Sequence, residues 1–192
     1  APLIGGDLAT HVHEDSADVV TVTILAVPTL PLDRVISRSG AKVGDLLAVT
    51  GRLGGSLDPA GGGRHLDFPP RIEEAIELAG LLGPDLVAML DVSDGVARDA
   101  GRLAVAGGLN VRINAATLPC NPGCGWEQAV GDGEDYELLF ACRRQPPAML
   151  HGLPVTVIGR FIEAPNAPGA VELEVDGSIR SIADLGWEHA GS

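Results

Sequence analysis

Short apolar runs typical of β-strands alternate with helical patterns through the middle of this sequence. The runs Leu46–Thr50 and Leu86–Leu90 are each followed by glycine or by polar residues, as is usual where a buried strand ends. Between them, residues 70–82 begin with a proline suited to a first helical turn and then carry apolar residues, among them Ile72 and Ile76, at helical spacing. This alternation is typical of an α/β protein.

The second half of the sequence continues the pattern. A helix is expected after Gly95, with Val96, Ala100 and Leu103 on its inward face. The dipeptide Asp176-Gly177 predicts a hairpin turn. Further strands are expected at residues 109–113, 137–142, 155–159, 171–175 and 178–182. Together these elements predict an α/β sandwich with a mixed β-sheet.

Composition excludes several classes of function. The 192 residues carry a formal net charge of −13, which argues against nonspecific nucleic-acid binding and against docking on anionic membranes. No apolar run is long enough for a membrane span and no signal peptide is visible, so we expect a cytoplasmic protein. Of the three cysteines, Cys120 and Cys124 could supply two metal ligands, but nothing nearby completes a zinc site.

The first candidate site is Asp91-Val92-Ser93-Asp94-Gly95. Two carboxylates stand where a buried strand ends and a helix begins, which is where α/β proteins place ligands and where helix N–H groups favour phosphate oxygens. Capping of the helix would explain one aspartate or the serine. It does not require all three, so we interpret the segment as part of a site for a nucleotide and a metal ion.

The second candidate site is Gly131-Asp132-Gly133-Glu134-Asp135-Tyr136-Glu137. Four acids within seven residues repel one another unless a cation or a ligand rich in hydrogen-bond donors relieves the repulsion. A solvated turn is the alternative, but these acids directly precede the apolar run Leu138–Phe140. We therefore favour a functional role for this segment as well.

Two further features leave alternatives open. Residues 54–63 contain five glycines and a proline, which predicts a mobile loop that could act as a lid. Arg71 follows a pair of prolines and could contact phosphate or could be a surface charge at the start of a helix. No glycine-rich phosphate loop with its lysine is present, so phosphoryl transfer would have to depend on Mg²⁺ and carboxylates.

Taken in order, the motifs resemble thiamine-monophosphate kinase, a member of the aminoimidazole ribonucleotide synthetase-like superfamily. The combination is specific, and its last motif separates this kinase from its relatives. The resemblance extends from Gly5 to Trp187 and is carried by the segments Leu3–Asp7, Ser37–Asp45, Val49–Gly51, Asp91–Gly95 and Gly133–Leu138.

The resemblance implies an activity and a set of site residues. The family uses ATP and Mg²⁺ to phosphorylate thiamine monophosphate to thiamine diphosphate by direct transfer, and its full-length members form homodimers. Carried over, Glu134 and Trp187 would contact the thiamine substrate, where an aromatic ring can stack on the cationic thiazolium. The ATP contacts would be Gly6, Asp7, Arg38 and Ser93, and the Mg²⁺ ligands would be Asp7, Asp91 and Asp94.

The chain departs from the family pattern in two places. The residues that family members carry before the Gly5-Gly6-Asp7 turn, with further metal ligands and the dimerising barrel, are absent. The long helix that normally follows Val49-Thr50-Gly51 is replaced by a short glycine-rich stretch. We therefore expect residues 1–30 to be the remnant of an amino-terminal domain and residues 31–192 to be the carboxy-terminal α/β domain, with weak or absent turnover by the chain alone.

Two other functions compete with the kinase. A non-catalytic nucleotide-binding or assembly module derived from the same fold is favoured by the absent amino-terminal half. A relative with a different substrate is disfavoured by Glu134-Asp135-Tyr136-Glu137.

Overall fold

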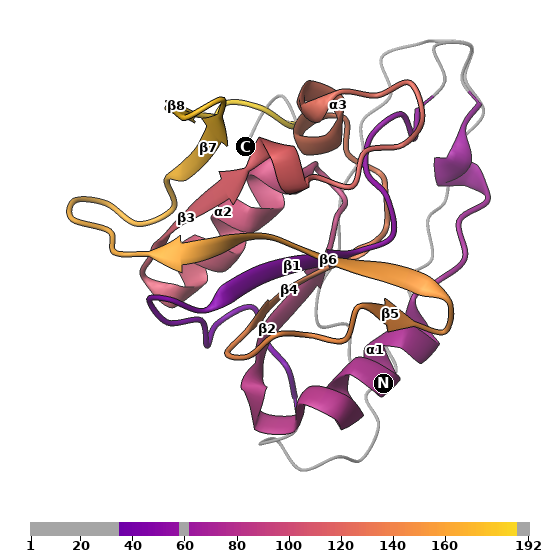
Figure 1. Ribbon diagram of the computed structural model, residues 1–192, viewed down its shortest axis with the longest axis horizontal. Helices are drawn as coiled ribbons and strands as arrows, with labels where there is room; N and C mark the ends of the chain where they lie inside the picture. The colour runs from indigo at the N-terminus through magenta and orange to yellow at the C-terminus, as the bar shows by residue number, and fades with distance from the viewer. Residues whose placement is uncertain (1–34, 58–61, 188–192) are drawn as a thin grey trace, which may run out of the picture. The chain divides into compact units, whose positions relative to one another are not determined.

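A single mixed sheet forms the centre of the structure. The computed structural model describes residues 35–57 and 62–187, and Figure 1 shows their arrangement. The strands lie in the order β2-β4-β1-β6-β3-β7-β8, with β5 paired to β6. The strands are β1 (Leu46–Thr50), β2 (Leu86–Asp91), β3 (Asn110–Asn114), β4 (Leu138–Cys142), β5 (Met149–Leu150), β6 (Leu153–Ile162), β7 (Val171–Val175) and β8 (Ser178–Ser181).

The strand pairing is antiparallel except between β3 and β7, which run parallel. The expected mixed sheet is therefore confirmed. Asp176 and Gly177 both have positive φ, 49° and 76°, in the predicted hairpin turn between β7 and β8, a conformation that glycine and aspartate tolerate better than most residues. The first candidate motif follows β2 and the second precedes β4, so the pairing of β2 with β4 brings the two together.

Helices cover both faces of the sheet, as Figure 1 shows. The helices are α1 (Ile72–Leu82), α2 (Val96–Gly107) and α3 (Trp126–Gly131), with 3₁₀ turns at Arg64–Leu66, Gly83–Asp85 and Ala115–Thr117. On one face, α2 buries Val96, Ala100 and Leu103 as expected, each with no exposed surface. On the other face, α1 packs Leu78 and Leu82 against Phe140 of β4.

The inward face of α1 differs from the prediction. Ile72 and Ile76, expected to face the core, are 64% and 68% exposed, whereas Leu82, at the end of the same apolar series, is buried as expected together with Leu78. The apolar residues of this helix are spread around more than one face, so spacing alone could not select the buried one. The short elements α3 and β5 were not expected from the sequence.

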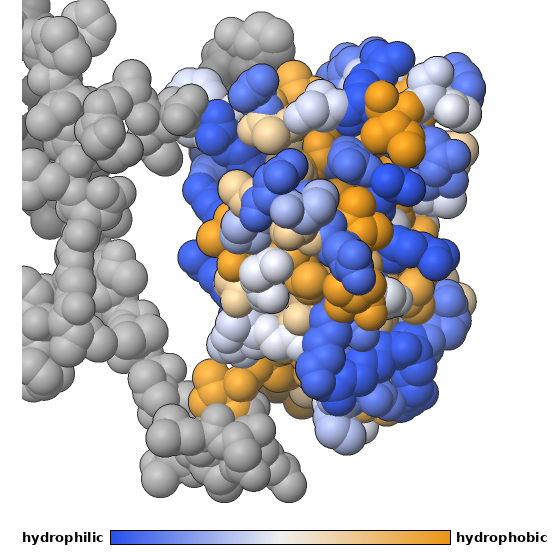
Figure 2. All heavy atoms as spheres, turned by 90° about the vertical axis from the view of Figure 1, so that its left-hand side faces the viewer, coloured by the Kyte–Doolittle hydropathy of each residue, from blue (hydrophilic) through white to orange (hydrophobic). Residues whose placement is uncertain are grey.

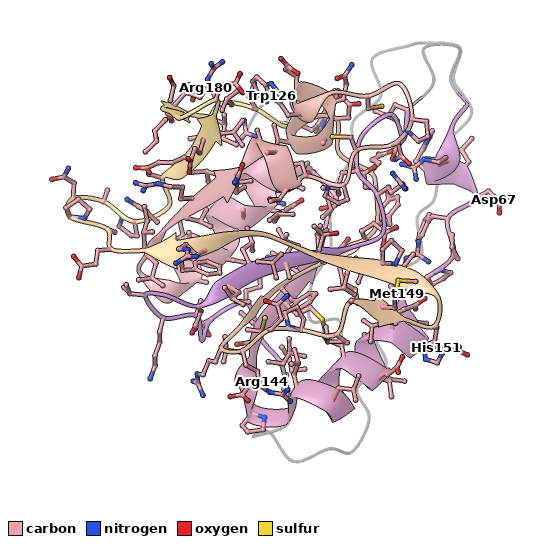
Figure 3. All side chains as sticks on the ribbon, in the orientation of Figure 1. Asp67, Trp126, Arg144, Met149, His151 and Arg180 are labelled. Atoms are coloured by element: carbon pink, nitrogen blue, oxygen red, sulfur yellow. The ribbon has the colours of Figure 1, made fainter. Side chains whose placement is uncertain are left out.

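The surface of the described residues carries many polar side chains, as the charged composition predicts. The face seen in Figure 2 is mostly hydrophilic, with apolar side chains between the polar ones. At the far edge of the sheet, Arg180 of β8 lies 5.4 Å from the ring centroid of Trp126 at the start of α3, and both are labelled in Figure 3. Within the described residues, no helix is both long enough and apolar enough to cross a membrane.

The buried thiol of Cys142 gives a direct test of the packing around β4. Burial, assisted by the charge of Asp45, raises the pKa of Cys142 to about 12, whereas Cys120 and Cys124 lie partly exposed. Because the thiolate is the reactive form, we expect iodoacetamide at about pH 8 to label Cys120 and Cys124 but not Cys142 in the folded protein. Tandem mass spectrometry measures this, because all three cysteines lie on the one tryptic peptide 113–143 and fragmentation is needed to locate each label. Labelling of Cys142 without denaturant would contradict the packing described here.

Candidate functional site

The two acidic motifs, Asp91–Gly95 and Gly131–Glu137, are joined by backbone hydrogen bonds. Together they are called the ledge. The amide N–H of Tyr136 donates to the carbonyl of Val92 at 2.9 Å, and that of Glu134 donates to the carbonyl of Ser93 at 2.8 Å. In return, the N–H of Val92 donates to the carbonyl of Glu137 at 2.8 Å. A Cβ added to Gly133, whose φ is +75°, would lie 2.8 Å from the carbonyl oxygen of Ser93, so this close approach requires glycine.

Side chains of the second motif alternate between the interior and the site. Asp135 and Glu137 are 6% and 2% exposed, whereas Glu134 and Tyr136 are half-buried. Glu134 and Tyr136 both have left-handed backbones, with φ of 51° and 52°. This conformation is uncommon and costly for residues with a side chain, so surrounding contacts must hold both residues in place.

Asp135 supplies one set of these contacts. Its carboxylate accepts from the N–H of Gly54 at 3.0 and 3.1 Å, from Ser56 Oγ at 2.5 Å and from Arg64 Nη2 at 3.0 Å. Burial nevertheless raises the pKa of Asp135 above its usual value, while the hydrogen bonds from Ser56 and Gly54 act in the opposite direction. Asp135 therefore attaches the described ends of the glycine-rich stretch, Gly54–Ser56 and Arg64, to the site.

Glu137 supplies the second set. Its carboxylate accepts from Arg71 Nε at 2.8 Å and Arg71 Nη2 at 2.7 Å, and from Thr50 Oγ1 at 2.7 Å. The hydrogen bond with Glu137 raises the pKa of Arg71. Of the two roles left open for Arg71, a surface charge is wrong, because the Arg71 side chain is only 15% exposed and is held in a bidentate ion pair with Glu137. The phosphate contact stays a prediction.

The repulsion among the acids of this motif is thus relieved largely by the protein itself. Asp132 accepts from the N–H of Gly55 at 2.8 Å, and Asp135 and Glu137 are neutralised by Arg64 and Arg71. The expectation that a cation or ligand must balance all four acids is therefore wrong for these three. Of the four, Glu134 has the weakest contact, 3.9 Å from His65 Nε2.

A buried aspartate shapes the first motif. Asp99, 1% exposed in α2, accepts from the N–H groups of Ser93 at 2.9 Å and Asp94 at 3.0 Å. Arg102 Nη1 donates to Asp99 at 2.6 Å, and Arg102 also pairs with Asp94. Burial raises the pKa of Asp99 despite these donors. Asp99 and Arg102 together fix the loop that presents Asp91 and Asp94.

The outward side chains of both motifs meet around Tyr136. Burial raises the pKa of the Tyr136 hydroxyl, and the negative charges of Glu134, Asp91 and Asp94 raise it further. Asp91 is exposed, and no hydrogen bond or ion pair to another described residue holds its carboxylate. Asp91 and Tyr136 also line a common cavity.

Of the other predicted site residues, Trp187 and Arg38 lie within the described part of the chain. Trp187 is 60% exposed, and its N–H donates to the carbonyl of Asp94 at 2.9 Å. Arg38 is exposed and lines a cavity of about 460 Å³ with Arg98 and Arg102, the partner of Asp94. Gly6 and Asp7 lie outside the described residues, as does the predicted remnant domain at residues 1–30.

Sequence reasoning missed several residues that build the site. Asp99 and Arg102 lie on α2 one or two turns beyond the first motif, where an acid and a base at i, i+3 spacing gave only a weak signal. Phe68 stacks on Tyr136 with ring centroids 4.1 Å apart. Nothing in the sequence connects these two aromatic residues, because they meet only in the folded chain.

Two aspartates of the described site have the chemistry of magnesium ligands. Mg²⁺ prefers oxygen donors and is commonly held by one or two carboxylates together with substrate phosphates and water. Asp91 and Asp94 offer such oxygens, although Arg102 would have to release Asp94. No group of three or more potential metal ligands occurs among residues 35–57 and 62–187, so the described residues could hold Mg²⁺ only with ligands from elsewhere.

Comparison with solved structures identifies the fold class of the chain. HypE in complex with ATP matches 83% of this chain and 56% of its own, with a TM-score of 0.61 and 16% identity, which establishes the fold alone. AaThiL complexed with AMPPCP and TMP matches 80% of this chain and 54% of its own, with a TM-score of 0.61 and 30% identity. The chain has the expected aminoimidazole ribonucleotide synthetase-like fold.

Sequence comparison is more specific, and it confirms the resemblance to thiamine-monophosphate kinases. The kinase of Rhodopirellula baltica is 34% identical over 83% of this chain and 51% of its own length. That of Halobacterium salinarum is 30% identical over 98% of this chain and 65% of its own length. The chain is thus a relative of these kinases and spans about half to two thirds of their length. No family model matches it.

Proposed function

We propose that this chain forms part of an ATP- and Mg²⁺-dependent kinase that converts thiamine monophosphate to thiamine diphosphate. The observation that carries the proposal is the backbone hydrogen bonding that holds the motifs Asp91–Gly95 and Gly131–Glu137 side by side, next to the paired strands β2 and β4, in a chain related to thiamine-monophosphate kinases. The related AaThiL is complexed with AMPPCP and TMP, which supports a site for a nucleotide and a phosphorylated acceptor.

The proposal divides the site into a nucleotide side and an acceptor side. Asp91 and Asp94, together with Asp7, would hold Mg²⁺, which neutralises phosphate charge during in-line transfer. Ser93, Arg38 and Gly6 would contact ATP. Glu134 and Trp187 would contact thiamine monophosphate. On this proposal Arg102 exchanges Asp94 for a phosphate oxygen when Mg²⁺ enters, since both its present partners are carboxylates.

The same proposal covers the domain organisation, the localisation and the partners of the protein. Residues 1–30 would be the remnant of an amino-terminal ATP-binding and dimerisation domain, and residues 31–192 the carboxy-terminal domain of a cytoplasmic enzyme that is a homodimer at full length. Neither nucleic acid nor membrane would be a partner, in keeping with the net charge of −13.

A non-catalytic nucleotide-binding module is the second candidate. It is favoured by the share of the relatives' length that the chain spans, 51% of the Rhodopirellula kinase. Because the chain spans only about half of the length of that relative, we expect this chain alone to turn over slowly at most.

Product formation separates the two candidates. The chain is incubated with Mg²⁺, ATP and thiamine monophosphate, and thiamine diphosphate is measured by chromatography. Product that disappears in Asp91→Asn and Asp94→Asn supports the kinase. Mg²⁺-dependent ATP binding without any product supports the module, and the absence of ATP binding would contradict both.

A further inference from the structure

Two cysteines share the loop that connects the 3₁₀ turn Ala115–Thr117 to α3. Cys120 and Cys124 are both free and partly exposed. The loop turns back on itself, because the N–H of Cys124 donates to the carbonyl of Asn121 at 3.0 Å and Gly123 has a φ of 86°. Burial raises the pKa of Cys120, and the charge of a Cys124 thiolate raises it further. The two sulfurs are therefore neighbours on one short loop.

This cysteine loop runs beside the segment that follows β1 (Figure 1), and hydrogen bonds join the two. The N–H of Leu53 donates to the carbonyl of Pro119, and the N–H of Asn121 donates back to the carbonyl of Leu53, both at 2.9 Å. Asn121 Nδ2 also donates to the carbonyl of Gly54 at 2.8 Å. A change in the cysteine loop is therefore transmitted directly to the start of the glycine-rich stretch.

Cys124 also contacts the glycine-rich stretch with its sulfur. Its Sγ lies 2.8 Å from the position that a Cβ on Gly55 would take, so this close approach requires glycine. The N–H of Gly55 donates to Asp132, and the N–H of Gly54 donates to Asp135. The same two glycines thus contact the cysteine loop and the second acidic motif.

We propose that Cys120 and Cys124 form a redox modification site, at which oxidation to a disulfide draws Cys124 away from Gly55 and loosens the glycine-rich stretch. The oxidant is a low-molecular-weight disulfide of the glutathione class. Because both thiols are free in the structure, bond formation requires the Cys124 sulfur to turn toward Cys120. Reversible disulfides of this kind in a reducing compartment are usually catalytic or redox-sensing. The inference does not depend on the kinase proposal.

The chemistry is thiol–disulfide exchange, and it balances without a further reagent. One cysteine thiolate attacks glutathione disulfide, forms a mixed disulfide and releases one glutathione. The other cysteine attacks the protein sulfur of that bond, releases the second glutathione and closes the disulfide. The pair loses two electrons and two protons, which the two glutathione thiols gain.

The order of the two attacks follows from the electrostatics. Because the raised pKa of Cys120 makes its thiolate scarce at neutral pH, we assign the first attack to Cys124. A Cys124 sulfur in a mixed disulfide carries no charge, which removes one cause of the raised pKa of Cys120. Cys120 is then the resolving thiol.

The first test treats the reduced, native chain with glutathione disulfide and then alkylates the remaining thiols in denaturant. We expect the tryptic peptide 113–143 to be two hydrogen atoms lighter and to carry one alkyl group, on the buried Cys142, which is the internal control. Cys120→Ser should stop at a mixed disulfide on Cys124. Cys124→Ser should acquire glutathione about threefold or more slowly than Cys120→Ser. A chain that keeps both thiols, or that ends with glutathione on each, would overturn the pair.

The second test measures the effect on the glycine-rich stretch by tryptic cleavage after Arg64 under native conditions. The oxidised chain should be cleaved about twofold or more faster than the reduced chain, because cleavage follows the population of the open form. The double variant Cys120→Ser with Cys124→Ser, whose folding is checked by a circular dichroism melt, should be cleaved equally before and after treatment. A disulfide that leaves cleavage unchanged would overturn the effect on the stretch. Neither test uses ATP or thiamine monophosphate, so failure of the kinase proposal would not alter their outcome.

Discussion

Replacing Glu137 with alanine should lower the free energy of unfolding by about 3–5 kcal/mol. The substitution removes the bidentate partner of Arg71, whose side chain is only 15% exposed, and leaves Thr50 Oγ1 without its acceptor. The guanidinium keeps only a 3.9 Å contact with Glu74, which is costly because little water reaches it. Urea unfolding followed by circular dichroism measures the change.

The control for this prediction is a glutamate without buried partners. Glu73 is exposed in the first turn of α1, so Glu73→Ala should change stability by less than about 0.5 kcal/mol. The double variant Arg71→Met with Glu137→Ala should recover part of the loss, since the guanidinium that lost its bidentate partner is removed as well. A Glu137→Ala protein as stable as Glu73→Ala would show that the ion pair does not hold the ledge.

Replacing Asp135 with alanine should release the glycine-rich stretch as well as destabilise the fold. The N–H of Gly54, the hydroxyl of Ser56 and Arg64 all lose an acceptor. Arg64 is 47% exposed and can turn to water, so the loss comes mainly from the buried donors. We expect a decrease of about 2–3 kcal/mol in unfolding free energy. Tryptic cleavage after Arg64 should become faster under native conditions.

The comparison for Asp135→Ala is Asp67→Ala. Asp67 is an exposed neighbour of the same segment, and its replacement should alter neither the unfolding midpoint nor the rate of cleavage after Arg64. Equal cleavage rates in Asp135→Ala and the unsubstituted chain would mean that Asp135 does not anchor this stretch.

Much of the fold could be predicted because its elements have clear local signals. Strands β1, β2 and β7 coincide with short apolar or alternating runs, and α2 has one apolar face. The inward face of α1 was predicted only in part: Leu82 is buried as expected, but Ile72 and Ile76 suit a core as well as Leu78 does. Only the packing against Phe140 decides between them.

The positions of the two acidic motifs beside strand ends could be predicted from the sequence, but the contacts of the individual acids could not. The pairing of β2 with β4 brings the two motifs together. Burial then separates Asp135 and Glu137, which bind arginines, from Glu134, which faces the site. Strand periodicity could not have shown this division, because Glu134 and Tyr136 have left-handed backbones. The partners Arg64 and Arg71 lie more than sixty residues away in sequence, so the pairing itself was hidden.

Mg²⁺-dependent ATP binding by this chain and by Asp91→Asn tests the central claim most directly. Asp91 has no partner among the described residues, so asparagine should leave the fold intact and remove only a metal ligand. Calorimetric titration with ATP, with and without Mg²⁺ at equal ionic strength, should show binding that requires Mg²⁺ and is weakened about tenfold or more in Asp91→Asn. Equal affinity in both proteins, or no Mg²⁺-dependent binding by the unsubstituted chain, would contradict a nucleotide–metal site on this ledge.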